Sequence, residues 1–452
     1  MHPPNGDFPP KTAAPSASDW PVSPVIEVHE PRNLILLAVH QVIFRVGWMF
    51  KTESVIVPAF LDYVAGPGAG ALRGCLPVLN RVGQSVLPVL VADRIRRTPQ
   101  KKLALAGITM LLSVPLAAVA AVQFQLGGQR SAWMPILFLG MYFAFSSIYG
   151  LYQLAFGTVQ GKLIRPTRRG RLLSVSTFWG TIPAVAVTLW LMPRWLEAPL
   201  PDYASVFTSG AVCLALAGVT AACLFEKGHG LDASAARPQE ALRVVIGTLR
   251  RDPALRRLIL VAMFFSVALM TFPHYQAMAR ERLGLGGAQH VLWIITQSAS
   301  VGVYSLFVGR LADARGNRLT LRLLIFGSAI APAFALAIVH LPAALGSALF
   351  WMTFIFLGLT PLVTPMLLNY ALEMCDPAEH PRYLSTVNLG MTVPFVFSPF
   401  LGKLVDLAGF EIVFLVTVCL IVAAGGLTFA LDEPRRHARR KEPGQLVHRA
   451  EE

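Results

Sequence analysis

The stretch Gly309-Arg-Leu-Ala-Asp-Ala-Arg-Gly-Asn-Arg318 lies between two apolar segments, each long enough to cross a membrane as a helix. It combines a carboxylate, two glycines and several basic side chains in one short turn. A related stretch in the first half, Val89-Leu-Val-Ala-Asp-Arg-Ile-Arg-Arg97, keeps the aspartate and the basic side chains but has neither glycine. Matching loops at matching places in two halves predict an internal repeat.

The two loops resemble the signature loop of the major facilitator superfamily, which joins two transmembrane helices on the cytoplasmic side. The resemblance implies an all-α membrane protein with twelve transmembrane helices in two six-helix bundles related by pseudo-twofold symmetry. It also implies a conformational latch, in which an aspartate faces basic side chains and the positive N-terminal end of a helix in the other bundle. The latch residues carried over to this chain are Asp93, Arg94, Gly309, Asp313, Arg315, Gly316 and Arg318, with Gly309 expected to permit close helix contact. The alternative is that both loops only supply the positive charge that stops transfer across the membrane.

Composition independently excludes a soluble globular protein. Hydrophobic residues make up 54% of the chain and charged residues only 14%, and the mean hydropathy is +0.57, which leaves too little polar surface to face water. The predicted membrane helices are 33–61, 72–92, 103–124, 133–160, 172–192 and 203–225 in the first half, then 258–278, 291–311, 319–339, 345–372, 383–404 and 412–431 in the second.

The net charge of +14 has a topological cause. Most lysines and arginines fall in the two tails and in the loops after even-numbered helices if the N-terminus is cytoplasmic, and this asymmetry predicts that both termini are cytoplasmic. No nucleic-acid role is expected, because the basic residues are explained by orientation. The excess of Arg over Lys and the abundance of Ala favour a bacterial inner (plasma) membrane.

Five regions follow from this pattern. We expect a proline-rich, disordered tail at 1–31, a six-helix bundle at 32–225, a linker at 226–257 with an amphipathic helix, a second bundle at 258–431 and a basic tail at 432–452. The five cysteines are scattered without metal-ligand spacing, so no metal or other cofactor is expected.

Two arginines fall inside predicted helices. At about 1.5 Å per residue, Arg45 is about 20 Å from the cytoplasmic boundary at Arg32, and Arg81 is about 18 Å from Asp93. Both therefore lie near the midplane, where a charge costs on the order of 2.5 to 3.5 kcal/mol. A water-filled cavity and an anionic ligand, or a structural role, would explain them.

Other polar side chains share faces with these arginines or lie on helices that line the substrate path in the resembled family. The candidate binding residues are Arg45, Arg81, Gln41, Trp48, Gln84, Tyr149, Tyr152, Gln153, Gln297 and Asn388. Packing or interfacial anchoring is the alternative for the aromatic residues, and interhelical hydrogen bonding is the alternative for Gln297 and Asn388. Glu53 and His274 are candidates for ion coupling. The alternatives for them are local pairing of Glu53 with Lys51 near the outer boundary, and a satisfied hydrogen bond at the outer end for His274.

No catalytic motif and no Walker lysine loop are present, so an enzyme is not expected. The leading interpretation is a monomeric transporter that moves a small solute, an anion in our prediction, by alternating access. The second interpretation is a membrane assembly factor or sensor of the same shape that carries no solute flux.

Overall fold

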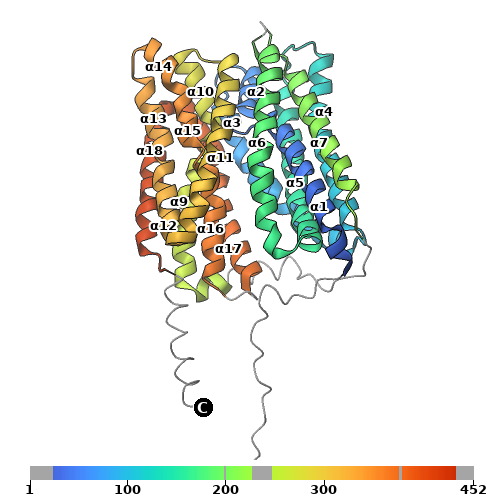
Figure 1. Cartoon of the computed structure of the whole chain (residues 1–452). Helices are drawn as coiled ribbons and strands as arrows, with labels where there is room; N and C mark the ends of the chain where they lie inside the picture. Colours follow the sequence, from blue (N-terminus) through green and yellow to red (C-terminus); the bar gives the residue numbers. More distant parts are fainter. Residues whose placement is uncertain (1–23, 198–199, 227–246, 376–378, 434–452) are drawn as a thin grey trace, which may run out of the picture.

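The structure is a computed structural model that describes residues 24–197, 200–226, 247–375 and 379–433 (Figure 1). Within these ranges, only the backbone is described at 24–28, 86–97, 166–171, 173–178 and 381. The predicted N-terminal tail up to residue 23, most of the linker and the basic C-terminal tail beyond residue 433 lie outside the described residues.

The first bundle consists of seven helices that make six crossings. They are α1 (Pro24–Met49), α2 (Ile56–Ala65), α3 (Gly70–Arg97), α4 (Lys101–Gln125), α5 (Met134–Leu163), α6 (Pro166–Leu196) and α7 (Tyr203–Ala222). Helix α1 begins at Pro24, inside the stretch predicted as a tail. It runs on to α2 across an interruption, so these two helices together form the first crossing.

The second bundle is more often interrupted. Its elements are α9 (Pro253–Met270), α10 (Phe272–Leu283), α11 (Ala288–Arg315), α12 (Asn317–Ser328), α13 (Ile330–Val339), α14 (Ala343–Leu349), η1 (Phe350–Met352), α15 (Thr353–Leu357), α16 (Thr360–Glu373), α17 (His380–Thr392), η3 (Val393–Phe397), α18 (Ser398–Leu427) and η4 (Thr428–Ala430). Gly409, with a φ of 83°, bends α18 into two crossings. Only glycine adopts this backbone conformation without strain.

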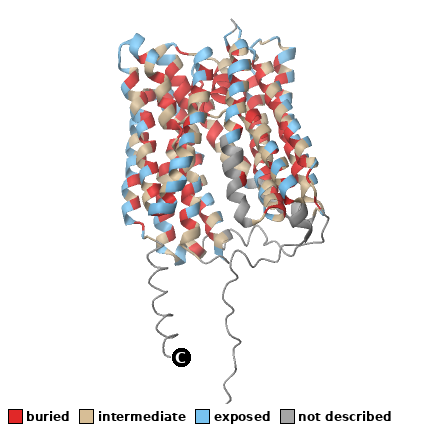
Figure 2. Cartoon of the chain, viewed as in Figure 1, coloured by how far each residue is buried: buried red, intermediate tan, exposed pale blue. Residues whose placement is uncertain are grey.

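In the second bundle the crossings are α9 with α10, α11, α12 with α13, α14 to α16, α17 with the first part of α18, and the rest of α18. The described helices therefore make six crossings in each bundle, as predicted. Eight helical segments among the described residues are long and apolar enough to span a membrane by length and composition. Side chains such as Phe307, Phe400 and Leu407 are more than half exposed, and exposed residues cover the outer surfaces of both bundles (Figure 2). Lipid, rather than water, suits a surface with so many exposed apolar side chains.

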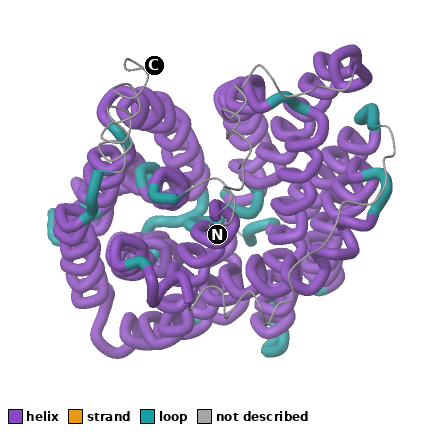
Figure 3. The backbone as a smooth tube through the Cα atoms, turned by 90° about the horizontal axis from the view of Figure 1, so that it is seen from below, coloured by secondary structure: helices purple, strands orange, loops and turns teal. Residues whose placement is uncertain are grey.

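The internal repeat predicted from the loops is visible in the packing. In the first bundle α1 packs on α6, α3 on α5 and α4 on α7; in the second, α9 packs on α17, α11 on α15, and α12 on α18. These are equivalent pairs, because crossings one and five, two and four, and three and six are neighbours in each half. Seen along the helix axes, the bundles lie side by side (Figure 3). The bundles touch through α3 with α18 and α6 with α11. We call the end where α1 begins the inner end, as the charge distribution predicts, and the opposite end the outer end.

Candidate functional site

Two adjoining cavities lie between the bundles. One has a volume of about 230 Å³ and is lined by α1, α3, α5 and parts of the second bundle, with Arg81 on its wall. The other has a volume of about 430 Å³ and contains Arg45. They share Trp48, Glu53 and Tyr149 from the first bundle. Their combined lining joins crossings one, two and four of the first bundle to crossings seven, eight, ten and eleven of the second.

The first crossing is interrupted where it reaches the cavity. Residues 50–55 are not helical, and the chain turns through a backbone hydrogen bond from the Phe50 amide to the Gly47 carbonyl (3.3 Å). The second helix begins with its Ile56 amide donating to the Thr52 hydroxyl oxygen (3.2 Å). Broken helices expose backbone groups only where they line a cavity or are buried in protein.

This interruption corrects the predicted depth of Lys51 and Glu53. Counting along a continuous helix placed them near the outer boundary. However, the crossing continues to Ala65 and turns Glu53 onto the wall of both cavities. The predicted local pair does form: the Lys51 ammonium lies 2.6 Å from a Glu53 carboxylate oxygen, with the Lys51 side chain only 2% exposed. Glu53 therefore lies on the same cavity walls as Arg45 and Arg81, which helical spacing did not reveal.

Aromatic rings enclose the Lys51 ammonium. Its Nζ atom lies 4.1 Å from the ring centroid of Trp48 and 4.7 Å from that of Phe145. Such rings attract a desolvated cation. The aromatic rings therefore surround the Lys51 ammonium, while the Glu53 carboxylate lies on the cavity wall.

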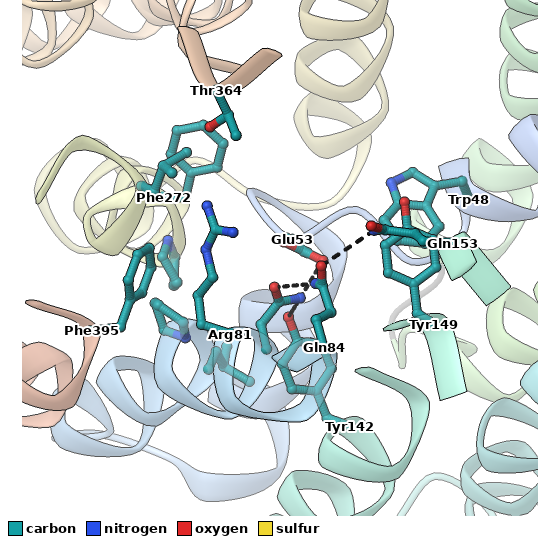
Figure 4. A pocket seen from close by; sticks show the side chains of 15 residues that line it. Trp48, Glu53, Arg81, Gln84, Tyr142, Tyr149, Gln153, Phe272, Thr364 and Phe395 are labelled. Carbon is teal, nitrogen blue, oxygen red and sulfur yellow. Dashed lines mark hydrogen bonds between the residues drawn. The ribbon is translucent and has the colours of Figure 1, made fainter. Parts of the chain in front are cut away.

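A chain of hydrogen bonds extends from Glu53 along the cavity wall (Figure 4). The Asn80 amide donates to the same Glu53 oxygen (2.7 Å) and to the Tyr142 hydroxyl (3.2 Å). Gln84 donates to Asn80, and Gln153 donates to Gln84 (3.4 Å). Sequence reasoning missed Asn80, although it stands four residues before Gln84 and so shares a face of the same helix.

Arg45 and Arg81 lack such partners. Neither guanidinium forms a hydrogen bond or salt bridge with the residues that the structure describes, and both line a cavity. Arg81 extends from α3 into the space between Phe272 and Phe395 (Figure 4), with its guanidinium 5.2 Å from the Phe395 ring centroid. Glu53 is the single carboxylate among the described lining residues, and it is paired with Lys51.

The remaining binding candidates divide into lining and supporting residues. Gln41, Trp48, Gln84, Tyr149, Gln153 and Gln297 line a cavity. Gln297 also accepts a hydrogen bond from Ser54 of the other bundle, which is the interhelical hydrogen bonding given above as the alternative to a binding role. Tyr152 is buried behind the wall, where its hydroxyl accepts a bond from Gln41 (2.7 Å). Asn388 is exposed on α17 and lines neither cavity, so the structure does not bring it together with the other candidates.

His274 is fully buried in α10, and neither of its ring nitrogens has a hydrogen-bond partner among the described residues. The satisfied hydrogen bond expected at this position is therefore not found. His274 does not line the cavities, although its neighbours Phe272 and Pro273 do. No group of three metal-ligating side chains occurs in the described part of the chain.

The latch residues lie at the inner end. Asp313 and Arg315 are exposed in the last turns of α11, and Gly316 follows with a φ of 90°. Arg318 lies 3.4 Å from Glu433 of the same bundle. A β-carbon at Gly309 would meet nothing within 4 Å, so the close helix contact expected there is absent in this conformation. The side chains of Asp93 and Arg94 lie outside the described ones.

Comparisons with known proteins agree with this architecture. The model of the Major Facilitator Superfamily matches residues 280–451. A variant of the nucleoside transporter NupG superposes with a TM-score of 0.67 at 12% identity, covering 88% of this chain and 100% of that one. A bacterial homologue of the human lysosomal transporter Spinster, in an inward-facing and unoccupied conformation, gives 0.62 at 12% identity and covers 89% and 97%.

A bacterial homologue of the iron transporter ferroportin, in an inward-facing state, gives a TM-score of 0.62 at 13% identity and covers 89% of this chain and 98% of that one. Among curated proteins, none matches the chain in sequence. At these identities the structural likeness shows the fold alone, and the match in sequence concerns the second half of the chain. The chain is therefore a multi-pass membrane protein with the fold of the major facilitator transporters, and its residues 280–451 match the Major Facilitator Superfamily in sequence.

Proposed function

We propose that this protein is a secondary transporter that carries a small organic anion, which Arg45 and Arg81 bind in the cavities between the bundles. The observation that supports the proposal is the pair of guanidinium groups on the cavity wall without a hydrogen-bond or salt-bridge partner among the described residues. A charge in this layer is costly unless it is compensated. An anionic ligand would compensate both arginines by charge-assisted hydrogen bonds.

The balance of charge on the wall supports the same sign. Lys51 and Glu53 form a close pair, so they add little net charge to the cavity. Arg45 and Arg81 then leave the described lining with an excess of positive charge. A cationic solute would have to compete with Lys51 for Glu53 and would face two guanidinium groups.

The shape and composition of the cavity favour an organic anion over an inorganic one. Trp48, Tyr149, Phe272 and Phe395 present flat apolar surfaces beside the arginines. The larger cavity, at about 430 Å³, falls within the range of small-molecule sites, roughly 300–1,000 Å³. Solved proteins of this fold include transporters of nucleosides and of oligopeptides, so we infer the substrate class from the cavity and not from the fold.

Thermal unfolding of purified protein tests the binding step. The panel is phenyl phosphate, benzoate, inorganic phosphate and benzylamine, which separates an aromatic anion from a bare anion and from an aromatic cation. A ligand at 100 times its dissociation constant stabilises the folded state by about 2.7 kcal/mol. We expect phenyl phosphate or benzoate to raise the unfolding temperature, and benzylamine to leave it unchanged.

The matched variants are Arg45→Gln and Arg81→Gln, with Arg130→Gln as control because Arg130 is exposed in the outer loop before α5. Loss of a hydrogen bond to a charged group costs roughly 1.5–3 kcal/mol, which weakens binding about 10- to 150-fold. Arg130→Gln should bind as the unmodified protein does. Unaltered affinity in both cavity variants, or stabilisation by benzylamine alone, would contradict the proposal.

A further inference from the structure

The two arginines of the proposed site line different cavities. Arg81 lines only the smaller cavity, and Arg45 lines only the larger one. The two cavities adjoin along a shared wall, which consists of Trp48, Glu53, Tyr149, Leu269 and Phe272. A ligand that reaches both guanidinium groups must therefore extend past this shared wall, from one cavity into the other.

The two arginines also lie towards different flanks of the space between the bundles. Arg45 lies beside α6, since its Cδ atom would be 3.4 Å from a β-carbon at Gly180. Its cavity is lined by residues of α11 such as Val301, so Arg45 lies towards the flank where α6 and α11 touch. Arg81 instead extends towards Phe395 of η3 (Figure 4), at the flank where α3 contacts η3 and α18. The two positive charges are thus placed for two separate groups of a ligand.

Glu53 disfavours a single anionic group placed between the arginines. Its carboxylate lies on the shared wall, and in Figure 4 it is seen between Arg81 and Trp48. The Glu53 Oε1 atom accepts hydrogen bonds from Lys51 (2.6 Å) and Asn80 (2.7 Å), whereas Oε2 has no such partner among the described residues. A compact anion midway along the wall would face this carboxylate, and like charges repel. An anionic group is therefore favoured at either end of the combined space and disfavoured in its middle.

Apart from Glu53, the shared wall suits an uncharged body. Trp48 and Tyr149 form an aromatic pair with ring centroids 4.7 Å apart. Leu269 and Phe272 add apolar surface from the second bundle. Flat apolar surfaces of this kind pack against a ring or a short hydrocarbon chain. The lining thus offers a positive charge, an apolar wall and a second positive charge in turn.

We propose that the solute is an elongated dianion, with one anionic group at Arg45, the other at Arg81 and an apolar body along the shared wall. The inference rests on the proposed function, because it divides the binding of the organic anion between the two arginines. A dianion compensates both guanidinium groups by charge-assisted hydrogen bonds. A monoanion held at one end would leave the other arginine uncompensated, and an uncompensated charge in this layer is costly.

Four carboxylates test whether the separation of the two anionic groups matters. Terephthalate carries two carboxylates at opposite ends of its ring, phthalate carries two on neighbouring carbons, and benzoate carries one. Terephthalate and phthalate have the same charge and the same atoms, so their comparison isolates the separation. Suberate is a flexible dicarboxylate that can adapt its span to the distance between the arginines.

Dissociation constants are measured by isothermal titration calorimetry of the purified protein. We expect terephthalate or suberate to bind at least about tenfold more tightly than phthalate and benzoate, which is the effect of about one additional hydrogen bond to a charged group. Because this comparison uses the unmodified protein, it decides the question even if an arginine variant does not fold.

The arginine variants assign the two ends. In Arg45→Gln and in Arg81→Gln, the preference for the elongated dianion over phthalate should disappear, because one of its ends then meets no cation. Arg130→Gln, in the outer loop before α5, should keep the full preference.

The inference and the anion proposal fail in different ways. If neither terephthalate nor suberate binds more tightly than phthalate, the two-ended ligand is overturned. The anion proposal survives that result if phthalate or benzoate binds and loses affinity in the arginine variants. A preference for the elongated dianion that both arginine variants retain would also overturn the inference, since other groups would then produce it. Absence of binding for all four carboxylates would contradict the inference and the anion proposal together.

Discussion

Replacing Gly402 with alanine should open the outer side of the protein. The new methyl group would clash with the Gly70 carbonyl and would lie 2.9 Å from its carbon and 3.0 Å from the Gly74 Cα. These are backbone atoms, so no side chain can rotate away, and α18 must move from α3. Overpacking a close contact costs roughly 1–3 kcal/mol.

This cost applies only to the state in which α3 and α18 touch at the outer end. A state with the outer ends apart accommodates the methyl group, so the equilibrium shifts towards it by roughly 5- to 150-fold. The assay replaces Thr364, which lines the smaller cavity, with a single cysteine in protein without native cysteines. It measures the rate at which a membrane-impermeant thiol reagent, added at the outer side, labels this cysteine. The unfolding temperature is measured in parallel. Gly426→Ala is the control, because Gly426 lies on the same helix and a β-carbon there meets nothing within 4 Å. If Gly402→Ala matches Gly426→Ala in both measurements, the close contact at the outer end does not exist as described.

Three further predictions concern buried or exposed charges. Glu53→Gln should destabilise the protein by roughly 3–5 kcal/mol, because the buried Lys51 ammonium loses its counter-ion. Lys51→Met should cost less, because the half-buried Glu53 carboxylate keeps its hydrogen bond from Asn80. Equal unfolding midpoints for the two variants would contradict this asymmetry. Asp62→Asn should destabilise more than Arg280→Gln, since it leaves the buried Arg73 without its closest carboxylate, and denaturant unfolding in detergent can rank the two. Asp313→Asn should insert normally but weaken closure of the inner side and reduce flux, and unchanged labelling of inner-side cavity cysteines together with unchanged flux would refute the latch.

Hydropathy, together with the resemblance of the two charged loops to a known family, was sufficient to predict the fold. The twelve crossings, the two bundles and the repeat are confirmed, because a membrane allows few ways to satisfy the backbone. Helix boundaries shifted where polar residues stay helical outside the apolar core. Asp62 is the clearest example, since the predicted helix 33–61 ended before it, whereas it is buried within α2.

The candidate site was predicted in part. Helical spacing correctly brought Gln41, Arg45 and Trp48 to one cavity wall, and Arg81 and Gln84 to another. Helical spacing could not predict the interruption at residues 50–55, because no proline or glycine lies between Gly47 and Pro58 to mark it. Hydrogen bonds between distant segments, such as those from Asn80 to Glu53 and from Gln276 to Asp62, depend on tertiary packing that periodicity does not encode.

Counterflow of labelled phenyl phosphate into proteoliposomes tests the central claim most directly, since it requires both binding and movement of an anion. Purified protein should give saturable uptake that excess unlabelled phenyl phosphate inside the vesicles drives, and both Arg45→Gln and Arg81→Gln should reduce it while Arg130→Gln should not. Uptake no greater than in protein-free vesicles, for phenyl phosphate and for benzoate-related impermeant anions alike, would contradict an anion carrier and favour an assembly or sensing role.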